Sequence, residues 1–368
     1  MRVGIIAATL GLIALTAGCG SSSSTGGGGG GASTSVYVIG QNTNTIFGFS
    51  ENSSGALIAF NGAPTHGTGS VPVSIAAHSS GKLVFVANNA DGVITILSRN
   101  TGNGQLSTPP LPPGALNPPP PINAGTQPVA MVATPNGSFL YVLNNGSHDI
   151  SAFSVDVTNN TLKTVGASTF QVPANPQFMT VSPDSKFLYV SNPAAGTITT
   201  LAINADGTLP AGTTTTVGSN PSFMLVDPQL RFLYVTNPAG NTVRVFSLSG
   251  GSLATEVSGS PFGAGTTPVA LAINPSGTFL LATNFGSNNV SAFNVSNAGA
   301  LSAVAGSPFA TGVNPSFVVF DKTNSFVYVA DSGSNDIAAY ALSGTTLRAL
   351  VGAPFPVGTS PTFISTGP

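Results

Sequence analysis

The sequence predicts an all-β fold built from seven similar units. One short strand-like phrase, rich in aromatic and β-branched residues, recurs through the chain. Its central aromatic residue or equivalent stands at positions 37, 85, 141, 189, 234, 281 and 328, so the steps are 48, 56, 48, 45, 47 and 47 residues. No window shows the helical period of about 3.6 residues. Because four short strands per period of about 45 residues form a propeller blade, we predict a seven-bladed β-propeller with four antiparallel strands per blade.

Each copy of the phrase has the same neighbours. A proline-led apolar run precedes it and ends in a turn, as in Pro268–Gly277. A turn rich in Gly and Asn follows, and then an alternating run such as Thr242–Leu248. A weaker fourth run comes last, with a Gly-Ser-Pro-Phe loop at 259–262 and 306–309. These runs supply the four strands of a blade.

The two ends of the repeat region complement each other. The first copy, at Val36, lacks a proline-led run before it, and the last such run, Pro361–Ser365, has no copy after it. We therefore predict that Pro361–Ser365 is the innermost strand of the blade formed by residues 35–62, and that this pairing closes the ring.

Composition excludes several classes of protein. Charged residues make up 5% of the 368 residues, against about 25% in a typical soluble domain. The 45 Gly and 29 Pro exclude long helices, and 41% hydrophobic residues argue against disorder. Nine Lys and Arg with a net charge of −2 provide no basic stripe, so we expect no nucleic-acid partner.

The N-terminal residues 1–18 are typical of an export signal. Arg2 precedes an apolar run, Val3–Leu15, that is too short to span a bilayer. Leu15-Thr16-Ala17-Gly18-Cys19 resembles a bacterial lipobox, although its Leu lies one place further from the Cys than is most common. The resemblance implies lipidation of Cys19; the alternative is an ordinary cleaved signal with an incidental cysteine. Residues 19–34, rich in Gly and Ser, would be a flexible tether to the propeller, 35–368.

The repeats resemble the YVTN family of propeller repeats, whose name-giving phrase stands here as Tyr234-Val235-Thr236-Asn237. The whole chain is also similar to the seven-bladed lactonase-like propellers, some of which open sugar lactones. This resemblance implies the fold and leaves the chemistry open, since the same repeats occur in surface proteins without a known reaction.

A recurring polar residue ends the second strand of most blades. A ring of such side chains around the channel mouth could bind a sugar or a peptide. Alternatively, each caps its own turn, and recurrence in nearly every blade favours this second interpretation. The candidate binding residues are Asn88, Asn144, Asn192, Asn237, Asn284 and Asp331.

Candidates for catalysis are few. His66 and His148 are expected on the loop-rich face, whereas His78 falls where other copies place a turn proline, at the opposite end. Asp91, Asp149 and Asp336 are expected in the same turn of different blades. A histidine with carboxylates could act as a general base or bind a metal, and the weak candidates are His66, His148 and Asp149. Their spread around the ring favours solvated turn residues instead, so we expect no metal and no cofactor.

The lactonase resemblance further implies a basic residue near the channel mouth. Lys82, Lys186 and Arg231 fall in turns on the opposite face, and Arg244 falls inside a third strand. A phosphorylated lactone is therefore disfavoured, because its phosphate needs cationic partners. An uncharged lactone stays open.

The proline-rich segment 108–122 breaks the period. It should be extended polyproline II, projecting from an inter-blade loop on the loop-rich face, either as a ligand for a protein groove or as a stiff spacer. Two functions follow from the sequence. The first is a monomeric, envelope-anchored scaffold that binds a carbohydrate or protein ligand, and the second is a hydrolase of uncharged sugar or other lactones.

Overall fold

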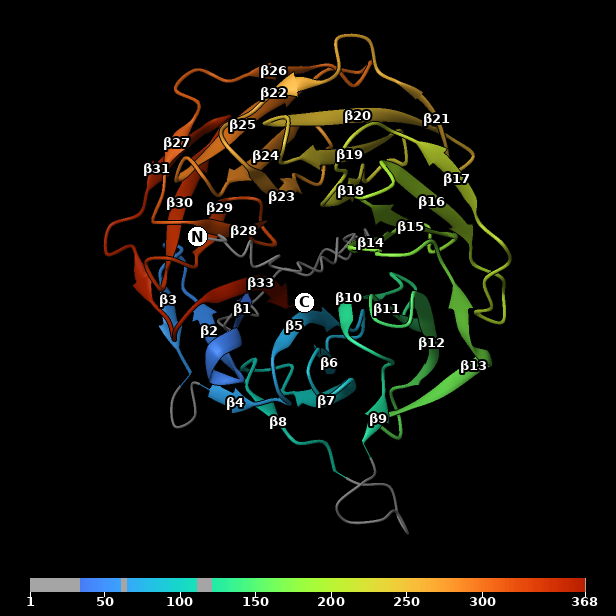
Figure 1. Cartoon of the computed structure of the whole chain (residues 1–368). Helices are drawn as coiled ribbons and strands as arrows, with labels where there is room; N and C mark the ends of the chain where they lie inside the picture. Colours follow the sequence, from blue (N-terminus) through green and yellow to red (C-terminus); the bar gives the residue numbers. More distant parts are fainter. Residues whose placement is uncertain (1–33, 61–64, 111–120, 368) are drawn as a thin grey trace, which may run out of the picture.

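The computed structural model describes residues 34–60, 65–110 and 121–367, which form seven antiparallel sheets arranged in a ring (Figure 1). The predicted seven-bladed β-propeller is confirmed. The predicted signal, lipidation site and tether lie outside the described residues except for Thr34, as do residues 111–120 of the proline-rich segment. Within the described ranges, no helix is long and apolar enough to cross a membrane.

The strands of each blade follow one another from the channel outward. Blade 1 has β33 (Pro361–Gly367), β1 (Ser35–Gly40), β2 (Thr45–Glu51), β3 (Leu57–Ala59) and β4 (Thr65–Gly67), with a 3-10 turn, η1 (Gln41–Thr43), between β1 and β2. Blade 2 has β5 (Pro72–Ala77), β6 (Leu83–Asn88), β7 (Val93–Arg99), β8 (Leu106–Ser107) and β9 (Ile122–Asn123). Blade 3 has β10 (Pro128–Ala133), β11 (Phe139–Asn144), β12 (Asp149–Asp156) and β13 (Thr161–Gln171). Blade 4 has β14 (Phe178–Val181), β15 (Phe187–Asn192), β16 (Thr197–Ala202) and β17 (Thr213–Thr216).

The last three blades repeat this order. Blade 5 has β18 (Met224–Val226), β19 (Phe232–Asn237), β20 (Thr242–Ser249), β21 (Ser252–Glu256) and β22 (Phe262–Gly263). Blade 6 has β23 (Pro268–Ile273), β24 (Phe279–Asn284), β25 (Asn289–Val295), β26 (Leu301–Ala303) and β27 (Phe309–Ala310). Blade 7 has β28 (Pro315–Phe320), β29 (Phe326–Asp331), β30 (Asp336–Ser343), β31 (Thr346–Ala349) and β32 (Phe355–Pro356). Where two short outer strands are present, each pairs with a different end of the third strand.

Two faces of the ring differ in their loops. The loops between second and third strands, and those leading into the next blade, lie on one face, which we call the mouth face. The turns between first and second strands, and between third and fourth strands, lie on the opposite face. Ser35 pairs with Gly367 at the start of β1 and the end of β33, so both ends of the propeller leave from this opposite face.

The predicted ring closure is confirmed, because β33 pairs antiparallel with β1 as the innermost strand of blade 1. The predicted origin of the proline-rich segment is wrong. Its flanking strands β8 and β9 both pair with β7, at opposite ends, so the segment interrupts the outermost strand of blade 2 and does not lie in an inter-blade loop.

Neighbouring blades are joined through the aromatic residue of the repeated phrase. The hydroxyl of Tyr141 donates a hydrogen bond to the carbonyl of Gly207 in the next blade (2.9 Å), and Tyr189 does the same to Gly251 (2.6 Å). The ring two residues earlier packs where a Cβ on that glycine would stand, as Phe187 does against Gly251. Glycine at positive φ therefore lets each turn approach the preceding blade closely.

The junction between blades 1 and 2 keeps this bond, from the Tyr37 hydroxyl to the Gly104 carbonyl, and adds a buried arginine. Ser35 stands where five of the other six copies have a phenylalanine, and Arg99, only 6% exposed, occupies this junction. Its guanidinium donates to the Tyr37 hydroxyl (2.8 Å), the Ser35 hydroxyl (3.1 Å) and the Gly81 carbonyl (3.1 Å). This buried arginine was not predicted from the sequence.

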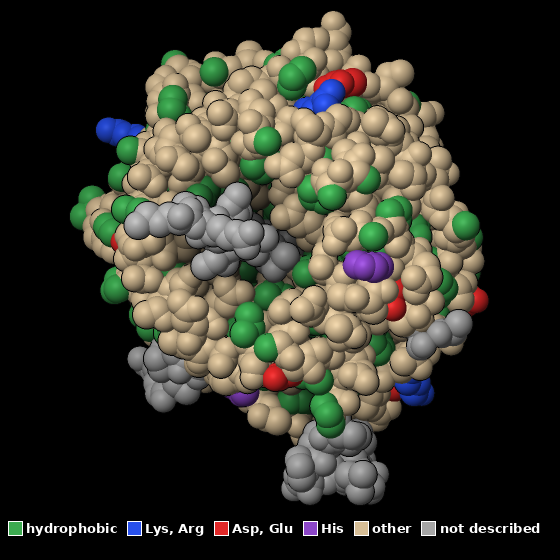
Figure 2. All heavy atoms as spheres, viewed as in Figure 1, with side chains coloured by type: hydrophobic (Ala, Val, Ile, Leu, Met, Phe, Trp, Pro, Cys, Tyr) green, Lys and Arg blue, Asp and Glu red, His purple; other side chains and the backbone are tan. Residues whose placement is uncertain are grey.

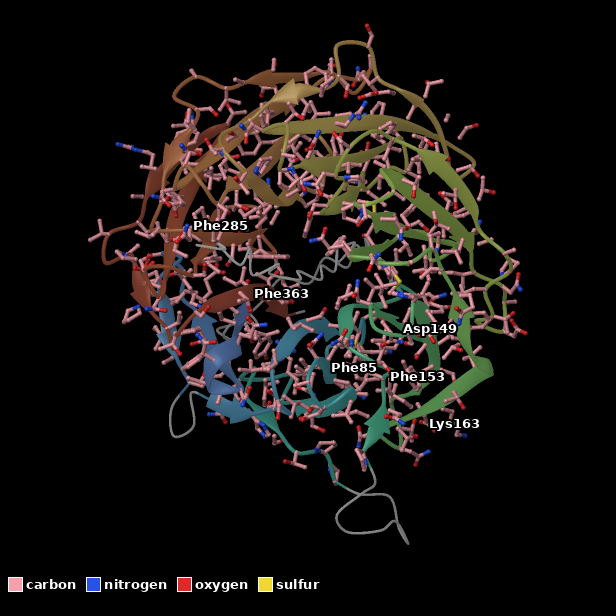
Figure 3. All side chains as sticks on the ribbon, in the orientation of Figure 1. Phe85, Asp149, Phe153, Lys163, Phe285 and Phe363 are labelled. Carbon is pink, nitrogen blue, oxygen red and sulfur yellow. The ribbon has the colours of Figure 1, made fainter. Side chains whose placement is uncertain are left out.

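Four phenylalanine rings fill the centre of the ring of blades. Phe178 stacks on Phe223 with centroids 4.4 Å apart, Phe223 meets Phe317 at 5.7 Å, and Phe317 meets Phe363 at 4.3 Å. All four are essentially unexposed, and Figure 3 shows Phe363 close to the centre. Because the strands that present Phe223 and Phe317 belong to blades that are not adjacent, these rings meet across the channel. We call them the phenylalanine plug.

Candidate functional site

A residue with left-handed backbone precedes the innermost strand of every blade. Each has φ between 52° and 57° and is followed by proline. These residues are Val71, Gln127, Asn175, Asn220, Thr267, Asn314 and Ser360. Asn adopts this conformation readily, whereas β-branched residues such as Val and Thr are outliers in it. The seven left-handed residues turn the chain from the mouth face into the channel.

A side chain of the preceding blade holds most of these left-handed residues in place. In four blades an asparagine, itself left-handed, accepts the backbone N–H of the next blade's residue at 2.7–2.9 Å. The pairs are Asn44 with Val71, Asn241 with Thr267, Asn288 with Asn314, and Asn335 with Ser360. His148 occupies the same position in blade 3, with φ 56°, and its Nδ1 accepts the N–H of Asn175 at 3.4 Å.

This contact limits what His148 can do as a base. A ring nitrogen that accepts an N–H carries no proton, so this contact favours the tautomer with the proton on Nε2. In that tautomer Nε2 is a hydrogen-bond donor, and His148 would have to give up the Asn175 contact to act as a base. Asp149 is buried, and its Oδ1 accepts hydrogen bonds from Asn144 (2.8 Å) and Ser147 (2.9 Å). A catalytic part for either residue stays a prediction.

The other histidines lie elsewhere. His66 is in β4, an outer strand of blade 1, and its Nδ1 contacts the Gly67 carbonyl at 3.0 Å. His78 lies on the opposite face, buried, with Nε2 2.8 Å from the Gly137 carbonyl, and burial lowers its pKa. Its predicted alignment was wrong by one place: like Thr134, it stands just before the turn's proline position, where it caps the turn through the Ser80 N–H.

The three aspartates lie at the turn between the second and third strands of their blades, as predicted, but not at equivalent positions. Asp149 and Asp336 begin the third strands of their blades, whereas Asp91 lies two residues before β7 begins and accepts the Ser70 N–H. Among the described residues no group of three His, Cys, Asp or Glu is placed to hold a metal ion.

The recurring residues that end the second strands are all buried. Their side chains bond to their own turn or to the loop that enters their blade: Asn88 donates to the Val93 carbonyl (3.1 Å) and Asn192 to the Pro173 carbonyl (2.9 Å). A part in ligand binding stays a prediction for the whole set, Asn88, Asn144, Asn192, Asn237, Asn284 and Asp331. In Asp331, burial raises the pKa of the carboxyl to about 7.

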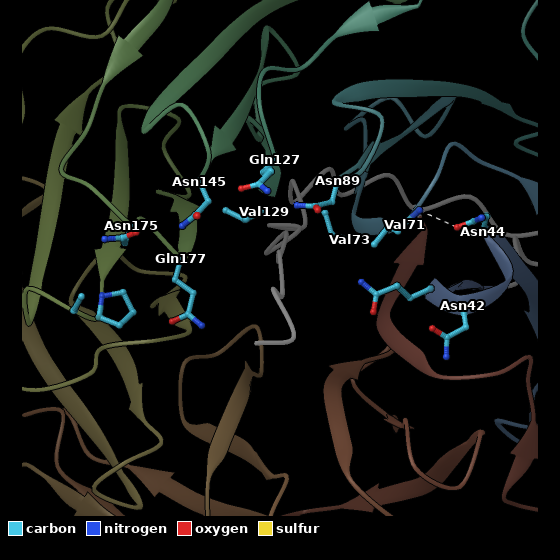
Figure 4. A pocket seen from close by; sticks show the side chains of 13 residues that line it. Asn42, Asn44, Val71, Val73, Asn89, Gln127, Val129, Asn145, Asn175 and Gln177 are labelled. Atoms are coloured by element: carbon cyan, nitrogen blue, oxygen red, sulfur yellow. Dashed lines mark hydrogen bonds between the residues drawn. The ribbon is translucent and has the colours of Figure 1, made fainter. Parts of the chain in front are cut away.

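A cavity of about 770 Å³ opens at the mouth face over blades 1 to 4 (Figure 4). We call it the mouth cavity. Its described lining carries amides and small apolar side chains and no charged residue or histidine. The amides are Gln41, Asn42, Asn44, Asn89, Gln127, Asn145, Asn175 and Gln177, and the apolar residues are Val71, Val73, Val129, Pro193 and Ala194.

The amides are of two kinds. Three support the fold: Asn44 accepts from Val71, Asn89 donates to the Pro128 carbonyl (2.8 Å), and Asn145 donates to the Pro176 carbonyl (2.7 Å). The other five make no side-chain hydrogen bond to any described residue, which leaves their donors and acceptors available. These are Gln41, Asn42, Gln127, Asn175 and Gln177.

The amides that line the mouth cavity were not predicted from the sequence, although several are next to residues or motifs that were. Asn89 and Asn145 directly follow the strand-end residues that were predicted, and Asn175 and Gln177 flank the proline of a first strand. The repeated X-Pro pair was the available signal.

The described basic side chains that form ion pairs lie away from the mouth cavity. Arg231 pairs with Asp227 (2.6 Å) on the opposite face, and Arg244 pairs with Glu256 (2.6 Å) between two outer strands. Figure 2 shows one whole face of the molecule, where uncharged side chains and backbone predominate.

The fold and the amide-lined mouth place the chain among seven-bladed propellers with a candidate small-molecule site at the channel. The family model described as lactonase, seven-bladed β-propeller, matches residues 166–268 and 253–366. The chain belongs to this lactonase family. Among curated protein sequences, none matches the chain significantly.

Several solved structures have a similar fold. A candidate 6-phosphogluconolactonase from Bacteroides uniformis has a TM-score of 0.76 at 18% identity, covering 91% of this chain and 100% of that one. A second candidate 6-phosphogluconolactonase, from Bacteroides fragilis, has a TM-score of 0.74 at 19% identity, covering 92% of this chain and 98% of that one. The periplasmic gluconolactonase of Pseudomonas aeruginosa has a TM-score of 0.70 at 20% identity, covering 91% of this chain and 99% of that one. At these identities the likeness establishes the fold alone.

Proposed function

We propose that this protein binds an uncharged, hydrogen-bonding small molecule, of the class of sugars and lactones, in the mouth cavity. The observation that carries the proposal is the set of five unpartnered amides in a lining without charge. Each amide offers two donors and an acceptor, which suits a ligand with hydroxyl or carbonyl groups. The cavity volume lies in the range of about 300–1,000 Å³ usual for small-molecule sites.

Family membership favours a lactone as the ligand. Lactonase propellers and the similarity to a gluconolactonase support a cyclic ester, while the uncharged lining disfavours a phosphorylated one. A phosphate would need Arg, Lys or clustered N–H donors.

The binding proposal is tested by isothermal titration calorimetry against a panel of neutral sugars and lactones, with 6-phosphogluconate as the anionic control. Replacing Gln177 by Ala should weaken binding about 5-fold or more, because a hydrogen bond to the ligand is lost. The matched control is Gln171→Ala, an exposed glutamine of β13 outside the lining. Equal affinities for the two variants would contradict the proposal.

Hydrolysis of an uncharged lactone is a second candidate, supported by the family. His148 is the titratable side chain in contact with a lining residue, Asn175. A lactone-opening assay on His148→Asn tests it, because Asn holds the same backbone contact in four other blades and so removes the imidazole without removing the support. Full activity in His148→Asn would exclude His148 as a catalytic residue. If the unaltered protein hydrolyses no lactone of the panel, hydrolysis is excluded and only the binding function is left.

We further propose that the propeller is a monomer held at the cell envelope by a lipid on Cys19, which the lipobox-like segment supports. In this position it would also serve as a scaffold for a carbohydrate or protein ligand. Palmitate labelling that is lost in Cys19→Ala would support the anchor. Labelling that persists in that variant would contradict it.

A further inference from the structure

Apolar side chains lie among the amides that line the mouth cavity. Val71 and Val73 lie at the entrance to blade 2 and Val129 at the entrance to blade 3, and Figure 4 shows Asn89 and Gln127 among them. Val73 and Val129 are buried beneath the rim, and Val71 is 37% exposed at the mouth. A ligand in this cavity would meet the exposed hydrocarbon of Val71 as well as the amides.

Val71 is placed there against its backbone preference. Its φ of 55° is left-handed, which crowds a β-branched side chain, and it precedes Pro72, which normally favours an extended residue. Three other blades have Asn in this position, namely Asn175, Asn220 and Asn314. The fold therefore does not require valine here. Strained positions that persist are concentrated at functional sites, where the side chain is needed for another reason.

We propose that the ligand is amphipathic, a neutral ring with hydrogen-bonding groups and one alkyl-bearing edge, and that Val71 determines this specificity. The inference rests on the proposed function and narrows its ligand class. A fully hydroxylated sugar would leave a hydroxyl group against the Val71 side chain without a partner, which costs free energy. An alkyl-substituted lactone would place its hydrocarbon there and its ester oxygens at the amides.

The chain offers its own control for the test. Thr267 is the other β-branched residue among the seven left-handed residues, it lies outside the cavity lining, and its N–H is held by Asn241 just as that of Val71 is held by Asn44. Val71→Asn and Thr267→Asn each replace a β-branched residue at left-handed φ by asparagine, and so relieve the same backbone strain. Both should raise the melting temperature by about 2 °C.

The two variants differ in what they do to binding. The probes are δ-decalactone, whose ring carries a pentyl chain, and glucono-δ-lactone, whose ring carries hydroxyl groups. The unaltered protein should bind δ-decalactone more tightly by calorimetry. Val71→Asn should weaken it about 4- to 15-fold, as expected for losing the apolar contact of one or two methyl groups, and Thr267→Asn should leave it unchanged.

Each outcome decides something separate. Unchanged δ-decalactone affinity in Val71→Asn, or tighter binding of glucono-δ-lactone by the unaltered protein, overturns the amphipathic ligand and leaves the binding function standing. Binding of neither probe and of nothing in the panel overturns the binding function itself, and this inference with it. A melting temperature that falls in Val71→Asn while it rises in Thr267→Asn removes the premise that valine is the strained choice.

Discussion

Asp331 should make the stability of this propeller depend on pH. It ends β29 at the position where five other blades have asparagine, and it is fully buried. The Thr311 hydroxyl contacts both carboxylate oxygens at 2.9 Å, and the Gly312 N–H donates to Oδ2 at 3.0 Å. Burial raises the pKa of this carboxyl to about 7, opposed by these hydrogen bonds and aided by the negative charge of Asp336.

The sign follows from proton binding. Between the ordinary pKa of 3.8 and about 7 the folded state keeps a proton that the unfolded state has released. The free energy of unfolding therefore falls as pH rises through this range, by up to about 1.4 kcal/mol per pH unit, and the full loss above pH 7 is about 4 kcal/mol. Replacing Asp331 by Asn, as in the other blades, removes this loss. The variant should be more stable than the unaltered protein at about pH 8 and close to it at about pH 4.

Urea unfolding at a series of pH values between about 4 and 8 measures the effect. Burial and the charge of Asp321 also raise the pKa of Glu51 to about 7. The unfolding free energy of the variant should therefore still fall with pH, but by less. The reverse change, Asn284→Asp in blade 6, is the matched control and should create a decline of the same sign. The reasoning is refuted if Asp331→Asn shows the same pH dependence as the unaltered protein, or is the less stable of the two at pH 8.

Three further predictions concern the ring itself. Tyr189→Phe should cost about 1–2 kcal/mol of unfolding free energy, because the Gly251 carbonyl loses its donor. Tyr234→Phe should be nearly neutral, since that hydroxyl has no partner among the described residues. Equal losses of the two variants in chemical denaturation would contradict this prediction. His148→Ala should lose about 1 kcal/mol and His148→Asn should retain the stability of the unaltered protein, and a thermal melt in which both fall alike would show that the Asn175 contact is unimportant. Deleting residues 361–368 should abolish cooperative unfolding, because β1 loses its inner partner and the phenylalanine plug loses Phe363; an unchanged melt would show that the ring closes without β33.

The blades and the closure could be predicted because they depend on local patterns that repeat. Each strand has its own alternation of apolar residues, and the unmatched ends of the repeat left one arrangement for Pro361–Ser365. The contacts between blades could not be predicted in this way. The Tyr141–Gly207 bond joins residues 66 positions apart, and the plug joins blades that are not adjacent, so neither has a signal within one repeat.

The site was predicted less well than the fold because its geometry is set residue by residue. Successive side chains on a strand point to opposite sides, so the residue that ends a strand and the one that follows it face different surroundings. Asn144 turns into its own blade, while Asn145 faces the mouth cavity. The left-handed conformation before each proline could not be expected either, since residues before proline usually extend. Repetition in all seven blades, with support from the preceding blade in several, overcomes that preference in this propeller.

The positions of the termini and of the mouth cavity bear on how an anchored propeller would work. Ser35 begins β1 on the face opposite the mouth cavity. An attachment through the residues that precede β1, such as the lipid proposed for Cys19, would therefore join the propeller on the face opposite the mouth. It would leave the entrance of the mouth cavity free for a water-dispersed ligand. Tethering the protein through its N-terminus should thus leave the affinity for a ligand of the mouth cavity unchanged, whereas coupling it through residues of the mouth face should reduce it.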